Sequence, residues 1–126
     1  MENLQTLEHG PGWRVGWRSL DLTFQGLLGT DQWAAELTAA EFKDFCRLLQ
    51  QLNQALQDSV TELMPEEKIS IEAETSLIWM EVAGDPQAYS LSFMILTGRR
   101  IEGYWPPPLA PEFIAACQNH IQHLSS

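Results

Sequence analysis

Four arginines are the side chains whose type and spacing best suit a binding site. Arg14 and Arg18 fall on one face of a predicted strand, and Arg99 and Arg100 stand together at a predicted hairpin. Guanidinium groups among tryptophan and tyrosine rings can hold a phosphate, a carboxylate or a single strand of nucleic acid. They can equally pair with glutamates of the chain itself, such as Glu102. Both interpretations stay open, and these four arginines form the candidate binding surface.

The other reactive side chains do not form a pattern typical of catalysis or metal binding. His120 and His123 are three residues apart on a predicted helix, but no carboxylate lies at helical spacing beside them. Glu72 and Glu74 point to the same side of a predicted strand, on a face that Ser70 marks as solvated. The sequence has no nucleophile elbow and no phosphate-binding glycine loop. We therefore expect no enzyme activity, no cofactor and no metal.

Charge and composition disfavour several kinds of partner. The chain has 17 Asp and Glu against 7 Lys and Arg, a formal net charge of −10, which repels nucleic acid and anionic membranes. No window approaches the roughly 18 apolar residues of a membrane span, and the first residues lack the pattern of a secretion signal. Cys46 and Cys117 stand singly in different predicted helices and are expected to be buried thiols. The sequence therefore predicts a soluble, cytoplasmic protein.

The first part of the sequence predicts short strands within a single domain that comprises all 126 residues. From Trp13 to Arg18, bulky apolar residues alternate with arginine and glycine, which is the period of a half-buried strand. Further extended segments are expected at Leu22–Leu28 and Gln32–Leu37, joined by a turn at residues 29–31. Residues 1–10 are predicted to be flexible.

The clearest element is a long helix that begins at Thr38. Its hydroxyl can cap the free N–H groups of the first turn while the carboxylate of Glu41 reaches back, the pattern of a capping box. Apolar side chains then recur every three or four residues until Pro65, so the helix should span about 25 residues with one apolar stripe. The stripe comprises Phe42, Phe45, Leu49, Leu52, Leu56, Val60 and Leu63. It can lie across a sheet of the same chain or against its copy in a dimer.

The second half of the sequence predicts four strands in a row and then a helix. Alternation and turn residues outline the strands at Ile69–Glu74, Leu77–Ala83, Ala88–Leu96 and Arg99–Trp105. Links this short favour an antiparallel meander. A proline strut at residues 106–108 leads into a helix that starts near Pro111 and should dock on the sheet. The predicted fold is α+β, with a long helix between an N-terminal group of strands and the four-strand meander, and a C-terminal helix.

Eight blocks of the sequence resemble one protein family and together cover nearly the whole chain, from Gly10 to Leu124. The blocks are Gly12–Arg14, Gly26–Gly29, Asp31–Ala34, Glu36–Phe42, Glu62–Glu67, Glu72–Glu74, Tyr89–Leu91 and Gly98–Trp105. The sequence is similar to the cyanobacterial domain-of-unknown-function family numbered 1818, although Thr30 and Gln32 stand where that family usually has a glycine and an aspartate. The resemblance implies a fold like that of the single-stranded-DNA-binding transcriptional regulators, including the Whirly proteins, and it implies no activity.

Two functions from different classes are compatible with these features. The complete fold pattern and the lack of a catalytic group favour a non-enzymatic binding or assembly protein whose partner is another protein. The alternative is single-stranded nucleic acid binding on the strand face that carries the four arginines, which the fold likeness suggests and the net charge opposes. The apolar helix stripe and the free strand edges also predict a homodimer.

Overall fold

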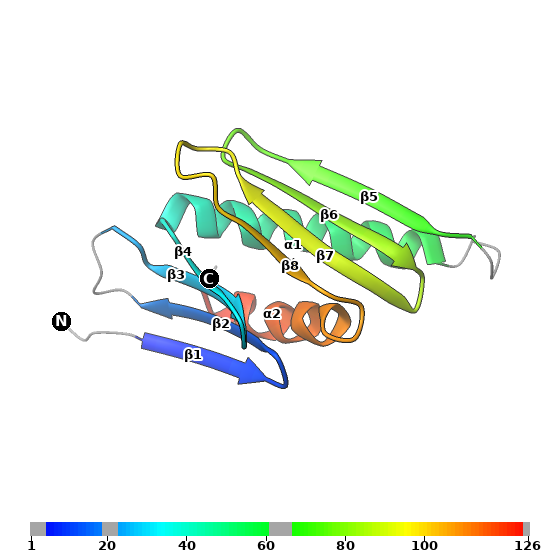
Figure 1. Cartoon of the computed structure of the whole chain (residues 1–126), viewed down its shortest axis with the longest axis horizontal. Coiled ribbons are helices and arrows are strands. Elements are labelled where there is room, and N and C mark those ends of the chain that lie inside the picture. Colours follow the sequence, from blue (N-terminus) through cyan, green and yellow to red (C-terminus); the bar gives the residue numbers. More distant parts are fainter. Residues whose placement is uncertain (1–4, 19–22, 61–66, 125–126) are drawn as a thin grey trace.

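The chain folds into two four-stranded antiparallel sheets and two helices (Figure 1). The computed structural model describes residues 5–18, 23–60 and 67–124. The elements are β1 (Gln5–Gly10), β2 (Trp13–Arg18), β3 (Gly26–Thr30), β4 (Ala34–Leu37), α1 (Ala39–Val60), β5 (Ile69–Glu74), β6 (Ile78–Asp85), β7 (Ala88–Ile95), β8 (Glu102–Trp105) and α2 (Ala110–Leu124). Sheet A has the order β1-β2-β3-β4, and sheet B has the order β5-β6-β7-β8. This is the α+β fold that the sequence predicts.

Sheet A begins earlier in the chain than expected. Residues 5–10, predicted to be flexible, form β1, which pairs with β2 from Gln5 opposite Arg18 to Gly10 opposite Trp13. The turn between the two strands requires a glycine, because Gly12 has a φ of 82°. Most residues of β1 are polar, so the sequence did not predict a strand here. The strand forms by pairing with β2, which follows directly in the chain.

The turn between β3 and β4 also differs from the prediction. Gly29 and Thr30 belong to β3, and the turn lies at Asp31 and Gln32 instead of residues 29–31. The N–H of Thr30 donates to the carbonyl oxygen of Trp33 at 2.9 Å, and the Thr30 hydroxyl accepts from the N–H of Gln32 at 3.1 Å. The expected extended segment at Leu22–Leu28 is described only from residue 23, and β3 begins at Gly26.

The capping box that begins α1 is confirmed. The hydroxyl of Thr38 accepts from the N–H of Glu41 at 3.2 Å, and the Glu41 carboxylate accepts from the N–H of Thr38 at 2.9 Å. The stripe side chains Phe42, Phe45, Leu49, Leu52 and Leu56 are all buried. Helix α1 packs on β5 and β6, so the chain itself covers the stripe. The predicted end of the stripe at Leu63 lies outside the described residues.

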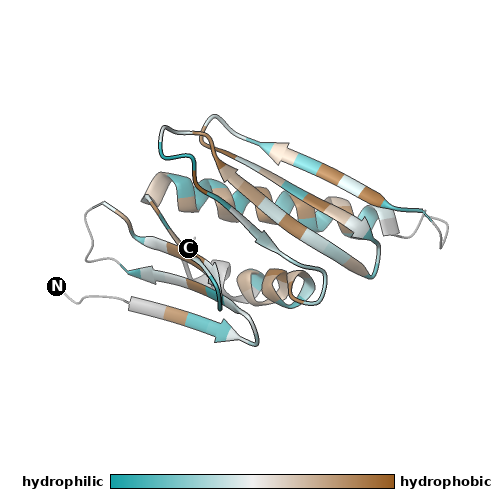
Figure 2. Cartoon of the chain, viewed as in Figure 1, coloured by the Kyte–Doolittle hydropathy of each residue, from teal (hydrophilic) through white to brown (hydrophobic). Residues whose placement is uncertain are grey.

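Sheet B is the predicted antiparallel meander, with small shifts at two turns. Asp85 pairs with Ala88, so the first of these turns lies at Pro86 and Gln87. Strand β8 begins at Glu102 and not at Arg99, because the turn after β7 includes both arginines and Arg100 has a φ of 55°. In Figure 2, apolar and polar residues alternate along β5, β6 and β7, as expected for strands that bury one face.

The core lies where both helices meet the inner faces of the two sheets. Trp105 is completely buried and stacks on Phe113 of α2, with ring centroids 4.2 Å apart and planes 14° from parallel. The indole N–H of Trp105 donates to the carbonyl oxygen of Gly29 at 3.1 Å, which ties β8 of sheet B to β3 of sheet A. Pro111 lies in the first turn of α2, as predicted.

The outer faces of the two sheets lie on the side away from the helices (Figure 1). Each strand of sheet B buries alternate side chains, such as Ile78, Met80 and Val82 of β6, and turns the others outward. Over the part of the chain that the structure describes, no helix is long and apolar enough to cross a membrane.

Candidate functional site

The predicted site residue Arg14 serves the fold. From the outer face of β2 its guanidinium donates to two carbonyl oxygens, that of Thr30 at 3.1 Å and that of Trp33 at 3.0 Å. These two carbonyls bracket the turn between β3 and β4. Arg14 therefore holds this turn closed, and its donors are directed at the backbone of the chain.

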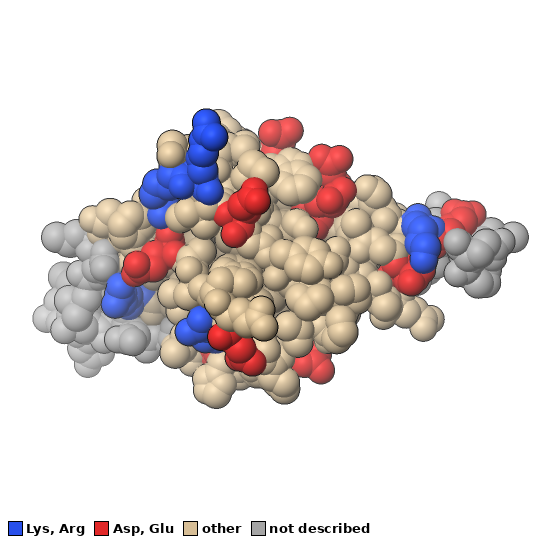
Figure 3. Space-filling model, in the orientation of Figure 1, with Lys and Arg blue, Asp and Glu red and all other residues tan. Residues whose placement is uncertain are grey.

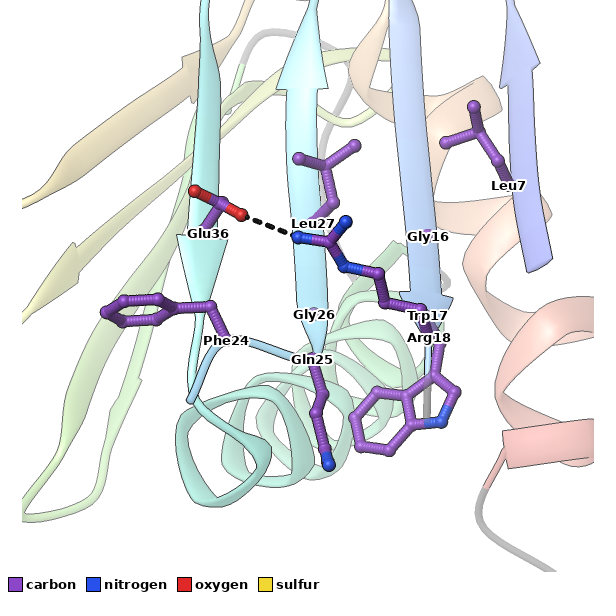
Figure 4. A pocket seen from close by; sticks show the side chains of 9 residues that line it. All are labelled: Leu7, Gly16, Trp17, Arg18, Phe24, Gln25, Gly26, Leu27 and Glu36. Atoms are coloured by element: carbon purple, nitrogen blue, oxygen red, sulfur yellow. Dashed lines mark hydrogen bonds and ion pairs between the residues drawn. The ribbon is translucent and has the colours of Figure 1, made fainter. Parts of the chain in front are cut away.

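Arg18 forms an ion pair on the outer face of sheet A. Its guanidinium lies 3.1 Å from the carboxylate of Glu36 on β4, and Figure 4 shows the arginine reaching across β3 to make this contact. The pair lines a groove of about 230 Å³ beside Gly16, where Leu7 and Leu27 supply apolar walls. Both partners are about half exposed, so the pair contributes little to stability.

Arg99 connects the loop after β7 to the beginning of α1. It forms an ion pair with the buried carboxylate of Glu41, donates to the carbonyl oxygen of Glu36 at 2.8 Å, and lies 4.7 Å from the ring centre of Phe24. The same carboxylate accepts from the hydroxyl of Thr97 at 3.1 Å. Arg99 therefore stabilises the junction of the two sheets.

The four predicted arginines thus do not form one open cationic surface. Arg18 and Arg99 converge on Glu36 from the two sheets, whereas Arg14 is held at a separate turn. Arg100 is exposed and lines a hollow over the end of β7. Internal pairing, one of the two interpretations that the sequence left open, describes Arg14, Arg18 and Arg99.

A cluster that the sequence analysis missed lies on the outer face of sheet B. Trp79 pairs with Met94 across β6 and β7, and Tyr104 pairs with Ser92 across β8 and β7, so these side chains share one face. Met94 is 37% exposed, Leu96 43% and Tyr104 50%, and they are three of the four large exposed hydrophobic residues in the described chain. We call Trp79, Met94, Leu96 and Tyr104 the outer stripe.

Three adjoining hollows follow the outer stripe along β8. The first, of about 510 Å³, lies over the loop after β7, and it shares Met94 and Glu102 with a second hollow of about 390 Å³. The second shares Trp33 and Tyr104 with a third hollow of about 520 Å³ beside Pro106. In Figure 3, which views this side of the molecule, the centre is largely uncharged, and acidic and basic groups lie around it. The hollows and the outer stripe form an apolar trough.

One signal in the sequence could have revealed the outer stripe. From β7 into the loop that follows, the sequence reads Ser90-Leu91-Ser92-Phe93-Met94-Ile95-Leu96. The alternate positions Ser90 and Ser92 are polar, but the next two positions in the same alternation, Met94 and Leu96, are apolar. A solvated face carries polar residues in that phase. Large apolar residues in the outward phase therefore indicate an exposed apolar patch.

The two cysteine thiols lie inside the protein. Cys46 on α1 and Cys117 on α2 are buried and unpaired, as predicted. Burial raises the pKa of the Cys46 thiol to about 12 and raises that of Cys117 well above its ordinary value, so both are protonated and unreactive at neutral pH. Among the described residues no group of His, Cys, Asp and Glu could hold a metal ion. The side chains of His120 and His123 lie outside the described part.

Fold and site together define a small α+β domain with an apolar trough that runs from the outer face of sheet B to the turns of sheet A. The sequence profile of the family named Domain of unknown function (DUF1818) matches residues 8–120, and the chain belongs to this family. A crystal structure of a protein of unknown function from Prochlorococcus sp. NATL2A, described as a DUF155 family protein, is 26% identical, with a TM-score of 0.85. The match covers 91% of this chain and 98% of that chain. No curated protein matches the sequence.

Proposed function

We propose that this chain is a non-enzymatic protein-binding domain and that the outer stripe contacts the partner. The observation that carries the proposal is the concentration of Met94, Leu96 and Tyr104 on one outward face. Apolar and aromatic side chains of this kind supply the buried centre of protein interfaces, and methionine adapts its shape to a partner. The helices pack on the opposite face of the sheet and leave the trough open.

Single-stranded nucleic acid binding receives less support. Affinity for phosphates depends on lysine and arginine that can displace counterions, and Arg14, Arg18 and Arg99 already donate to acceptors of the chain. Aromatic rings of the outer stripe could stack on bases, but carboxylates surround them. The expected likeness to the Whirly proteins, a cyanobacterial source and a cytoplasmic location stay predictions.

Affinity capture with matched variants tests the proposal. Tyr104→Ser removes a ring from the outer stripe, and Leu7→Ser removes an apolar side chain of similar exposure, 52% against 50%, from sheet A. Each tagged protein is expressed in the native cell, and the captured proteins are compared by quantitative mass spectrometry. We expect a partner that the wild type and Leu7→Ser retain and that Tyr104→Ser loses by about tenfold, the loss typical of an interface anchor.

Two results would contradict the proposal. One is a set of captured proteins that is the same for all three forms of the chain. The other is a partner lost equally from both variants, which would assign the contact to general surface hydrophobicity. Circular dichroism of each variant checks that the fold is intact.

A further inference from the structure

The charges on the two sheets differ sharply. Sheet A is balanced, with Arg14 and Arg18 on β2 against Glu8 on β1 and Glu36 on β4. The four strands of sheet B contain Glu72, Glu74, Glu81, Asp85 and Glu102 and no lysine or arginine. Of the two sheets, sheet B is therefore the acidic one.

The glutamates of sheet B share the face of the outer stripe. In the strand register, Glu74 lies opposite Trp79, Glu102 lies opposite Met94, and Glu72 lies opposite Glu81. Residues directly opposite each other in a sheet project to the same side, so Glu74 and Glu102 flank the stripe. The indole N–H of Trp79 donates to the Glu72 carboxylate at 2.7 Å, which holds that ring in the stripe.

Cations on or beside sheet B lie at its ends. Lys68 precedes β5 and is bonded to Asp85 at 2.5 Å, while Arg100 lines the hollow over the loop after β7. The middle of the trough, around Met94 and Tyr104, is therefore apolar with carboxylates on its borders. An incoming cation there gains from the carboxylates and from the faces of the aromatic rings.

The distribution of charged and apolar residues along the trough favours some binding partners over others. Nucleic acid and anionic membranes would be repelled by the glutamates. A second copy of the chain packed face to face about a two-fold axis would bring the same glutamates against each other, which is unfavourable. A protein segment that alternates basic and apolar residues satisfies both features, because its apolar side chains fill the hollows and a basic side chain can pair with Glu102, which lines two of them.

We infer that the outer stripe binds a cationic, partly apolar segment of a partner protein, laid along the hollows beside β8. The inference rests on the proposed function and adds the chemistry of the partner. The three hollows adjoin in a line through shared residues, Met94 between the first two and Tyr104 between the last two, so an extended segment fits the trough.

The test uses two fluorescein-labelled synthetic peptides of equal length. Both alternate apolar and charged residues, with lysine in one and glutamate in the other, and fluorescence anisotropy measures binding to the full chain at about 0.15 M salt. We expect the lysine peptide to bind at least about tenfold more tightly than the glutamate peptide. Tyr104→Ser should weaken binding of the lysine peptide by about tenfold, and Leu7→Ser should leave it unchanged.

A matched pair of charge variants separates a local site from general attraction to an acidic protein. Glu102→Gln and Glu112→Gln remove the same charge from exposed carboxylates, one beside the outer stripe and the other on α2. We expect Glu102→Gln to lower affinity for the lysine peptide by about threefold or more, with no change for Glu112→Gln.

The outcomes that would overturn the inference differ from those that would overturn the proposed function. Equal losses for Glu102→Gln and Glu112→Gln would indicate nonspecific charge attraction and reject the cationic segment. Equal binding of both peptides, lost in Tyr104→Ser, would reject the charge preference but leave the protein-binding surface in place. Failure of both peptides to bind below about 1 mM would also reject the inference, while the capture experiment would decide the proposed function independently.

Discussion

Replacement of Glu41 by alanine should be among the most destabilising single changes in this chain. Glu41 is only 3% exposed, and its carboxylate serves three donors: the N–H of Thr38 at 2.9 Å, the hydroxyl of Thr97 at 3.1 Å and the guanidinium of Arg99. It therefore joins the beginning of α1 to the loop after β7, which is 56 residues away in the sequence at Thr97.

The expected loss follows from these three contacts. The capping interaction with Thr38 contributes about 1 kcal/mol to the free energy of unfolding, and the Thr97 bond contributes about 1 kcal/mol. Removal of the carboxylate also leaves the Arg99 guanidinium, whose side chain is 29% exposed, with fewer acceptors, which costs about 1–3 kcal/mol. We therefore expect Glu41→Ala to lower the free energy of unfolding by about 3–5 kcal/mol. Glu41→Gln should cost less, because its amide oxygen can still accept from Thr38.

Urea denaturation followed by tryptophan fluorescence measures this loss. The control is Glu112→Ala, which removes an exposed carboxylate from the first turn of α2 and should cost no more than about 0.5–1 kcal/mol. A loss below about 1 kcal/mol for Glu41→Ala, or one equal to that of Glu112→Ala, would refute the role of this carboxylate as a junction between helix and loop.

Four further predictions concern the core, the thiols, the arginines and assembly. Leu52→Ala truncates a side chain 1% exposed on α1 and should lower the free energy of unfolding by about 2–5 kcal/mol; a loss below about 1 kcal/mol would mean that the stripe is not core. The raised pKa of Cys46 means that the unfolded chain releases this proton near pH 9.0 and the folded chain near pH 12. Stability should therefore fall across that range by up to about 1.4 kcal/mol per pH unit, and less steeply in Cys46→Ala. Single-stranded DNA should bind poorly at about 0.15 M salt in an anisotropy assay. Sub-micromolar affinity of the wild type, lost in an Arg99→Ala/Arg100→Ala variant, would instead support single-stranded nucleic acid binding as the function. We predict a homodimer that forms through free strand edges such as β5, so light scattering at micromolar concentration should give the mass of two chains. The mass of one chain would reject the homodimer.

Local patterns predicted those parts of the fold that depend on neighbouring residues. Thr38 and Glu41 are three residues apart, and the spacing alone indicated the cap that the structure contains. The stripe of α1 and the alternation along β5 and β6 likewise follow from the periods of helix and strand. These features could be read in the sequence because each depends on repeats within one element.

The remaining features depend on contacts between distant segments. The sequence made Arg14 a candidate for ligand binding, but in the structure it donates to the carbonyl oxygens of Thr30 and Trp33. Trp33 lies 19 residues further along the chain, so no local pattern indicates this contact. Arg99 meets Glu41 across 58 residues. Trp79, Met94 and Tyr104 lie on one face only because of the register in which β6, β7 and β8 pair. A sequence pattern specifies no such register between strands.

The most direct test of the central claim asks what covers the outer stripe in the living cell. A photo-crosslinking amino acid is incorporated at position 104 in one form of the chain and at position 7 in another, since Tyr104 and Leu7 have nearly equal exposure on different sheets. After irradiation, the crosslinked products are separated by mass. We predict a discrete adduct with another protein from position 104 and none from position 7. No adduct from position 104, or the same products from both positions, would contradict the claim that this face binds a protein.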